Sequence, residues 1–145
     1  MTTIANGTHD VDVPHADAPT FAPGVRLSSA DVIVLLFGAV AATALALLTW
    51  WWGFVVAFVV GHFFLFCNVF RIGRTSELLW ALVFVLLVAG TIAADSPGWA
   101  ITVAVSLSLT AVLVLIEMRK PSYHGIGWQR INPELPAWWQ ARETK

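Results

Sequence analysis

The longest apolar stretch of the chain runs from Val32 to Phe70 and contains no Asp, Glu, Lys or Arg residue. A single straight helix over it would measure nearly 60 Å, at about 1.5 Å per residue. A bilayer core is about 30 Å thick and takes roughly 20 residues to cross. Near the middle, Trp50-Trp51-Trp52-Gly53 combines aromatic rings that favour the membrane interface with a glycine that lets the backbone turn. The pattern predicts two helices, 31–50 and 53–70, that form a hairpin.

A second apolar region follows a short basic loop and is interrupted by Asp95-Ser96-Pro97-Gly98. Because these residue types favour turns, the region predicts a second hairpin with helices 78–94 and 99–118. Together the two hairpins predict an all-α integral membrane protein with a four-helix transmembrane domain over residues 28–118.

Polar residues mark where these helices are expected to begin. Ser28 followed by Asp31 resembles a capping box, in which side chain and backbone of the two residues exchange hydrogen bonds. Thr75 or Ser76 is expected to cap the third helix, and Ser96 the fourth.

The two flanks of the helical domain are polar. Residues 1–27 are acidic and proline-containing, which predicts a flexible cytoplasmic tail. Its His and Asp residues match no metal-binding spacing, so no metal site is predicted there: His9, Asp10, Asp12, His15 and Asp17. Residues 119–145 are predicted to be a cytoplasmic segment with a short amphipathic helix at 133–142. Its tryptophans suit either the lipid headgroup layer or a protein contact.

The composition supports the membrane assignment, because 58% of the residues are hydrophobic and only 12% are charged, against about 25% charged in soluble domains. The net charge of −1 gives no indication of a nucleic-acid partner, and the single cysteine, Cys67, excludes an intrachain disulfide. In a four-pass topology all 8 basic residues lie on one side. The positive-inside rule then places both termini in the cytoplasm, in the plasma or inner membrane if the protein is bacterial. These residues are Arg26, Arg71, Arg74, Arg119, Lys120, Arg130, Arg142 and Lys145.

Small residues recur every four positions along three of the predicted helices, a spacing that lets membrane helices approach closely. Asn68 follows the second stripe by seven positions and is expected to form an interhelical hydrogen bond. The stripes are Gly38, Ala42 and Ala46; Gly53, Ala57 and Gly61; and Ala100, Ala104 and Ser108.

His62 lies well inside the second predicted helix, and an ionisable group at that depth is a functional candidate. The favoured interpretation is a neutral imidazole bonded to a neighbouring helix, with Thr102, Ser106 and Thr110 as possible partners. The alternatives are ligation of a pigment or haem and the handling of a proton or substrate. A haem held by two histidines would need a second intramembrane histidine, and nothing else in the chain demands a pigment, so no cofactor is predicted.

A further group of polar residues is expected at the cytoplasmic face. A carboxylate–histidine pair there could do acid–base chemistry, and the arginines could hold a phosphate. The favoured interpretation is that these charges satisfy helix ends and lipid headgroups. The residues are Arg71, Arg74, Glu77, Glu117, Tyr123 and His124.

These patterns favour a non-catalytic accessory, structural or assembly subunit of a larger membrane complex, which would bind the bilayer and other membrane subunits. A small transporter would be expected to carry an intramembrane carboxylate or arginine, and an enzyme would need a clustered catalytic set. The alternatives are a small transporter, a pigment- or haem-binding subunit that uses His62, and an enzyme with a site on the cytoplasmic face.

Overall fold

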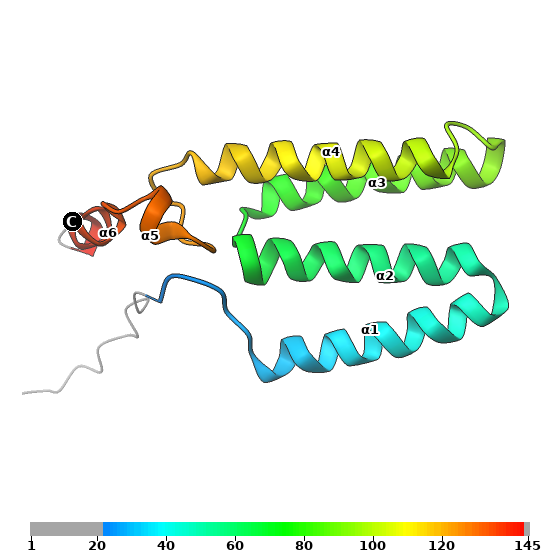
Figure 1. Ribbon diagram of the computed structural model, residues 1–145, viewed down its shortest axis with the longest axis horizontal. Helices are drawn as coiled ribbons and strands as arrows, with labels where there is room; N and C mark the ends of the chain where they lie inside the picture. Colours follow the sequence, from blue (N-terminus) through cyan, green and yellow to red (C-terminus); the bar gives the residue numbers. More distant parts are fainter. Residues whose placement is uncertain (1–21, 144–145) are drawn as a thin grey trace, which may run out of the picture.

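The computed structural model describes residues 22–143, and all its regular elements are helices (Figure 1). The predicted tail up to residue 21, with its His and Asp residues, lies outside the described part. The helices are α1 (Ser29–Leu48), α2 (Trp50–Phe64), the π-helix η1 (Leu65–Phe70), α3 (Arg74–Ala94), α4 (Trp99–Met118), α5 (Trp128–Ile131) and α6 (Leu135–Glu143).

Four helical segments are long and apolar enough to cross a membrane, as the sequence predicts. The segments span 20 or 21 residues each, and α2 continues without a break into η1 to form one of them. The π-helical turns of η1 were not expected, and such turns occur frequently at functional sites.

The residue that caps the helix is the predicted one at α1 but not at α3 or α4. At α1 the capping box is present, with the backbone N–H of Asp31 donating to Ser28 Oγ at 3.2 Å. α3 begins at Arg74 with Gly73 as its N-cap, so neither Thr75 nor Ser76 caps it. α4 is preceded by Gly98 at φ 89°. The predicted caps at these two helices are therefore wrong, because a glycine occupies each cap position.

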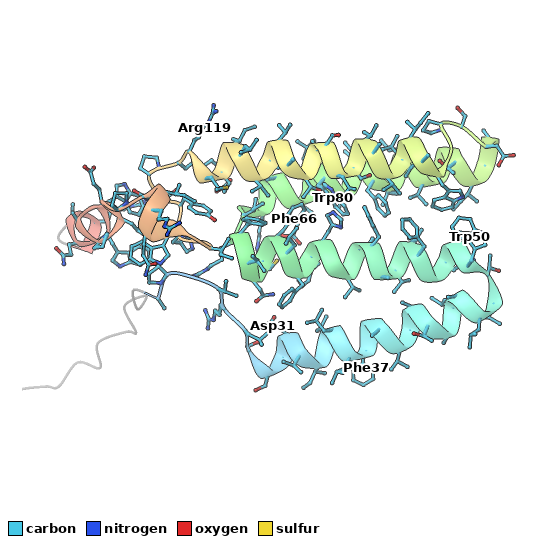
Figure 2. All side chains as sticks on the ribbon, in the orientation of Figure 1. Asp31, Phe37, Trp50, Phe66, Trp80 and Arg119 are labelled. Carbon is cyan, nitrogen blue, oxygen red and sulfur yellow. The ribbon has the colours of Figure 1, made fainter. Side chains whose placement is uncertain are left out.

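A single extended residue, Thr49, joins α1 to α2. The predicted turn at Trp50–Gly53 is instead the first turn of α2. Its tryptophans lie close to the start of α4: Trp50 and Trp99 meet edge to face at 5.2 Å between ring centroids. Trp50 lies at the end of the helical unit opposite Asp31 and Arg119 (Figure 2).

The hydrophobic core lies among α2, α3 and α4, and α1 stands outside it. Figure 2 shows Phe66 and Trp80 pointing between the helices, whereas Phe37 of α1 points away from α2. Among the residues of α1, only Ala42 is buried. The core residues are Phe66, Ile72, Trp80, Phe84, Val88, Leu113 and Val114.

The small-residue stripes are divided between the inside and the outside of the unit. A Cβ atom at Gly53 would collide with the carbonyl oxygen of Ala42 and with Ala46, so this glycine sets the approach of α1 to α2. A Cβ at Gly38 would lie 2.8 Å from Cγ1 of Val60. By contrast, a Cβ at Gly61 would meet nothing within 4 Å.

The rest of these stripes is exposed in the structure. The exposed members are Ala57, Gly61, Ala100, Ala104 and Ser108, whereas Ala46 is exposed on one side and packs against Gly53 on the other. On α4 the buried face is instead the polar one, formed by Thr102, Ser106 and Thr110. The four-residue spacing therefore identifies faces suited to close packing, but the fold uses only the part around Gly38, Ala42, Ala46 and Gly53.

Candidate functional site

His62 lies in an aromatic environment between α2 and α3 and is only 8% exposed. Its ring stacks on Trp80 at 4.4 Å between centroids with an interplanar angle of 15°. Phe58 covers the imidazole at 4.2 Å, and Phe66 meets it at a steep angle. The imidazole therefore packs as one member of a row of rings.

The hydrogen bond of His62 is made within its own helix, which differs from the expected interhelical bond. Nδ1 lies 2.8 Å from the carbonyl oxygen of Phe58, one turn earlier, and a carbonyl can only accept. This contact assigns the proton to Nδ1 and leaves Nε2 as an acceptor. Nε2 is enclosed and has no hydrogen-bond partner among the described residues.

The hydroxyl groups expected to meet His62 bond other partners, either within α4 or between α3 and α4. Thr102 shares a hydrogen bond of 2.8 Å with Thr91. Ser106 Oγ donates to the carbonyl oxygen of Thr102, and Thr110 Oγ1 donates to that of Ser106. The Nε1–H of Trp80 also donates to the carbonyl oxygen of Ser106, so the ring beside His62 is fixed in place.

A second site lies at the end of the unit where residues 22–28, 68–74 and 121–127 meet, called the junction face below (Figure 1). Asn68 of η1 is its buried centre. The Arg26 N–H donates to the Asn68 carbonyl oxygen at 3.1 Å. With its amide oriented to donate, Asn68 reaches the Arg26 carbonyl oxygen at 2.8 Å and Asp31 Oδ2 at 3.1 Å. Asn68 thus joins η1 to α1 and to the segment before α1.

The C-terminal segment completes the junction face. The Ile126 N–H donates to the carbonyl oxygen of Val69 at 2.9 Å, and the Gly24 N–H donates to that of His124 at 2.8 Å. Gly125 lies against Phe70, where a Cβ atom would collide with the carbonyl oxygen. Because the last carbonyls of a helix lack intrahelical partners, these contacts satisfy the end of η1 with both flanking segments.

Tyr123 and Asn132 brace the C-terminal segment. The Tyr123 hydroxyl donates to the carbonyl oxygen of Ile126 at 2.8 Å, and burial raises the pKa of this phenol. Asn132 donates through Nδ2 to the carbonyl oxygens of Pro121 and Tyr123. The helix predicted at 133–142 is present as α6 and begins at Leu135.

The acidic and histidine candidates of this face do not form an acid–base pair. Glu117 makes an ion pair of 2.7 Å with Lys120, and no other is found in the described part of the chain. Glu77 accepts a long contact of 3.8 Å from Cys67 Sγ. His124 Nδ1 bonds the carbonyl oxygen of Ser122. Each group has its own partner, so the arrangement does not support acid–base catalysis.

Arg71 directly follows η1 and has left-handed backbone geometry, with φ at 51°. Its Nη1 donates to the carbonyl oxygen of Ala22 at 2.6 Å. Burial lowers the pKa of the Arg71 guanidinium, and the positive charge of Arg26 lowers it further. The sequence assigned Arg26 only to the basic side of the helices and did not indicate its contact with Asn68, because nothing in the residue pattern shows that the segment before α1 folds back onto η1.

Within residues 22–143 no group of three or more His, Cys, Asp or Glu side chains is placed to hold a metal ion. No protein-family model matches the chain, and no curated protein or solved structure is significantly similar to it. Function is therefore inferred from the geometry of the chain itself.

Proposed function

We propose that the protein is a non-catalytic subunit of a larger membrane complex and binds other membrane subunits through its helices. The observation that supports this most strongly is that faces of small residues are exposed on the outer surface of the four-helix unit. Small side chains let helix backbones approach within van der Waals distance, the main source of attraction between helices in a lipid environment.

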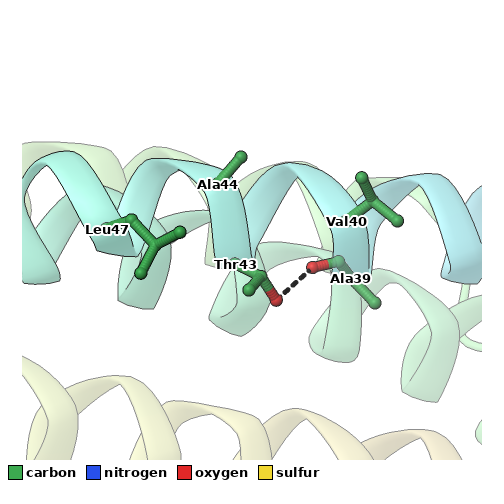
Figure 3. A pocket seen from close by; sticks show the side chains of 5 residues that line it. All are labelled: Ala39, Val40, Thr43, Ala44 and Leu47. Carbon is green, nitrogen blue, oxygen red and sulfur yellow. Dashed lines mark hydrogen bonds between the residues drawn. The ribbon is translucent and has the colours of Figure 1, made fainter.

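One such face is a shallow groove along the outer side of α1 (Figure 3). Thr43 Oγ1 donates to the carbonyl oxygen of Ala39 at 2.8 Å, so the hydroxyl is satisfied and the surface is effectively apolar. The groove faces away from α2, which leaves it open to another helix. It is lined by Ala39, Val40, Thr43, Ala44 and Leu47.

Two further faces have the same character. On α2, Ala57 and Gly61 are exposed although they lie on the same stripe as the buried Gly53. On α4, the exposed stripe is Ala100, Ala104 and Ser108, whose hydroxyl bonds the carbonyl oxygen of Ala104. The buried hydroxyl groups of α3 and α4, by comparison, bond each other or backbone carbonyls, and His62 is enclosed by rings, which supports a packing role over a catalytic one.

The orientation that fits this function is the one with both termini in the cytoplasm. It rests on the 8 basic residues of one side and the positive-inside rule. α6 then lies at the cytoplasmic surface, where Arg142 sits 4.8 Å over the ring of Trp138. Cysteines placed at Ser96 and Ser76, in a Cys67→Ser background, test it with an impermeant thiol reagent. Only the cysteine at Ser96 should react in intact cells, and the reverse pattern would exclude this orientation.

The assembly itself is tested by Gly61→Leu and Ala44→Leu, which fill two exposed faces. We expect both variants to remain folded but to lose co-purifying membrane proteins in mild detergent. Leu86→Phe is the matched control, because Leu86 is equally apolar and exposed but lies outside the small-residue faces. A purified wild type that is monomeric and transports or converts a small molecule alone would contradict the proposal. So would a tetrapyrrole absorption band that His62→Gln removes.

A further inference from the structure

Nε2 of His62 is the only buried side-chain nitrogen or oxygen in residues 22–143 that lacks a hydrogen-bond partner. Buried polar atoms in proteins are nearly always paired, so an unpaired one calls for an explanation. The proton of the neutral ring is on Nδ1, which donates to the carbonyl oxygen of Phe58 at 2.8 Å. Nε2 therefore carries a lone pair that can accept a proton.

The rings around His62 can stabilise a positive charge on it. Trp80 stacks on the imidazole with its face, at 4.4 Å between ring centroids and an interplanar angle of 15°. A cation within about 6 Å of the centre of an aromatic face is attracted to it, most strongly by tryptophan. The indole is held in this position by its hydrogen bond to the carbonyl oxygen of Ser106. A protonated imidazole would thus be stabilised where it forms.

The same packing does not satisfy the protonated ring completely. An imidazolium donates hydrogen bonds from both nitrogens, and among the described residues Nε2 has no acceptor to meet. A charge and an unpaired donor are both unfavourable among apolar rings. The packing seen in the structure therefore suits the neutral form, and protonation favours an arrangement in which Nε2 reaches water or another acceptor.

No other titratable group in the described part of the chain is bonded to His62. Those on the neighbouring helices all lie toward the junction face: at the first turns of α1 and α3, in η1 and at the end of α4. The thiol in η1 contacts the carboxylate of α3 at 3.8 Å, and the carboxylate of α4 pairs with Lys120. These groups are Asp31 of α1, Cys67 of η1, Arg74 and Glu77 of α3, and Glu117 of α4.

η1 is the element through which a change at His62 would reach the junction face. The segment becomes π-helical at Leu65, three residues after His62, and π-helical turns are rare and frequently lie at functional sites. Phe66 of η1 meets the imidazole edge to face, at 5.9 Å between ring centroids and an interplanar angle of 73°. Asn68, two residues later, holds the segment before α1. A displaced imidazole would therefore move η1 by direct ring contact.

We propose that Nε2 of His62 binds a proton reversibly and that protonation separates α2 and η1 from α3, so that the packing of the helices depends on pH. The proton comes from the solvent, and the structure corresponds to the neutral, closed arrangement. Binding the proton gives the ring a second donor and a charge, and the imidazole then leaves its place between Phe58 and Trp80. The change takes place between helices of one chain and is independent of the outer faces that support subunit binding.

The first measurement is nuclear magnetic resonance of the full chain in detergent with isotope-labelled histidine. The signals of His62 are identified by their loss in His62→Gln. We expect them to change from the form protonated at Nδ1 to the doubly protonated form between about pH 8 and about pH 5, the range in which histidine ordinarily changes its charge. Signals that stay in the neutral form throughout would overturn the proposal.

The second measurement is the distance between spin labels on α2 and α3. The labels are attached to cysteines that replace the exposed Val59 and Leu82, in a Cys67→Ser background. We expect a shift to longer distances at low pH, with the same midpoint as the His62 signals. His62→Phe keeps a ring in the row without a nitrogen, so it should hold the distance at its neutral value at every pH. His62→Gln should do the same.

His124→Gln is the matched control, because it removes an imidazole of the junction face whose Nδ1 bonds the carbonyl oxygen of Ser122. It should leave the shift in distance unchanged. A wild-type distance that is independent of pH would overturn the proposal. The same conclusion would follow from a shift that both His62 variants retain, or from one that His124→Gln removes.

Discussion

The interface between α1 and α2 is built from small residues, whereas aromatic rings join α2 to α3. At the first interface, Gly53 lets the α2 backbone approach Ala42 and Ala46. At the second, the rings of Phe58, His62, Trp80 and Phe84 overlap, with Trp80 and Phe84 stacked at 5.1 Å between centroids. A larger side chain should therefore disrupt the first interface, and a smaller side chain should disrupt the second.

The aromatic interface should give the largest effect. Trp80 is 3% exposed and contacts four other rings, so Trp80→Ala leaves a cavity that these rings cannot fill. We expect a loss of about 4 kcal/mol in the free energy of unfolding, as for large aromatic residues in other cores. Thermal unfolding in detergent measures it, with Trp52→Ala on the exposed surface as the control. A loss similar to that of the control would show that the rings do not stabilise the fold.

The small-residue interface should respond to an increase in size. Gly53→Leu places a side chain where the α1 backbone lies, and we expect a loss of about 3 kcal/mol together with separation of α1 from α2. Gly61→Leu, on the same helix, should leave the stability nearly unchanged, because the space beside Gly61 is open. A cross-link between cysteines at Gly38 and Val60, whose Cβ atoms would lie 3.4 Å apart, would report the separation. Equal destabilisation by both variants would contradict the difference between the two positions.

The junction face lies outside both interfaces, and a rise in pH should destabilise it separately. Burial raises the pKa of Tyr123 above its ordinary value near 10, so the folded state holds this proton more tightly than the unfolded state. The stabilisation is complete below pH 10 and is lost as the pH rises through the pKa of the folded protein. Tyr123→Phe should remove this part of the pH dependence and cost about 1 kcal/mol for the hydrogen bond to Ile126.

Because Tyr123 is the single tyrosine of the chain, its ionisation can be followed directly by ultraviolet absorbance. A titration midpoint at or below that of free tyrosine would show that the phenol is not protected by the fold. Amide hydrogen exchange at high pH should increase first in the residues around Ile126 rather than in α2 or α3.

The smallest expected effect concerns the buried hydroxyl pair between α3 and α4. Thr102→Val leaves Thr91 without its partner and should cost about 0.6 kcal/mol, the average for hydrogen bonds between membrane helices. Combining it with Thr91→Val should restore most of the stability, because no polar group is then left unpaired. A double variant that is less stable than the single one would show that the two residues pack through their shape rather than their hydroxyls.

The helices could be predicted from the sequence because their length and apolar character are local properties. The start of α1 was predicted for the same reason, since Ser28 and Asp31 lie three residues apart and bond each other. The four-residue spacing at Gly53 and Gly61 predicted suitability for packing, but it could not say which glycine meets a neighbour.

The junction face and the row of rings could not be predicted in this way. Arg26 and Asn68, or Val69 and Ile126, are far apart in the chain, and nothing in either segment specifies the other. His62 was recognised as unusual for its depth, but its packing on Trp80 depends on how α2 and α3 are rotated against each other. Such rotations follow from the packing of the whole unit.

The hydrogen bond from Gly24 to His124 has a consequence for the order in which the protein is made. Synthesis proceeds from the N-terminus, so the segment before α1 leaves the ribosome first and its partner emerges a hundred residues later. All four long helices can be in place before that partner exists. The bonds of Gly24 to His124 and of Ile126 to Val69 can therefore form only after all four long helices have been made, which makes this closure a late step of maturation.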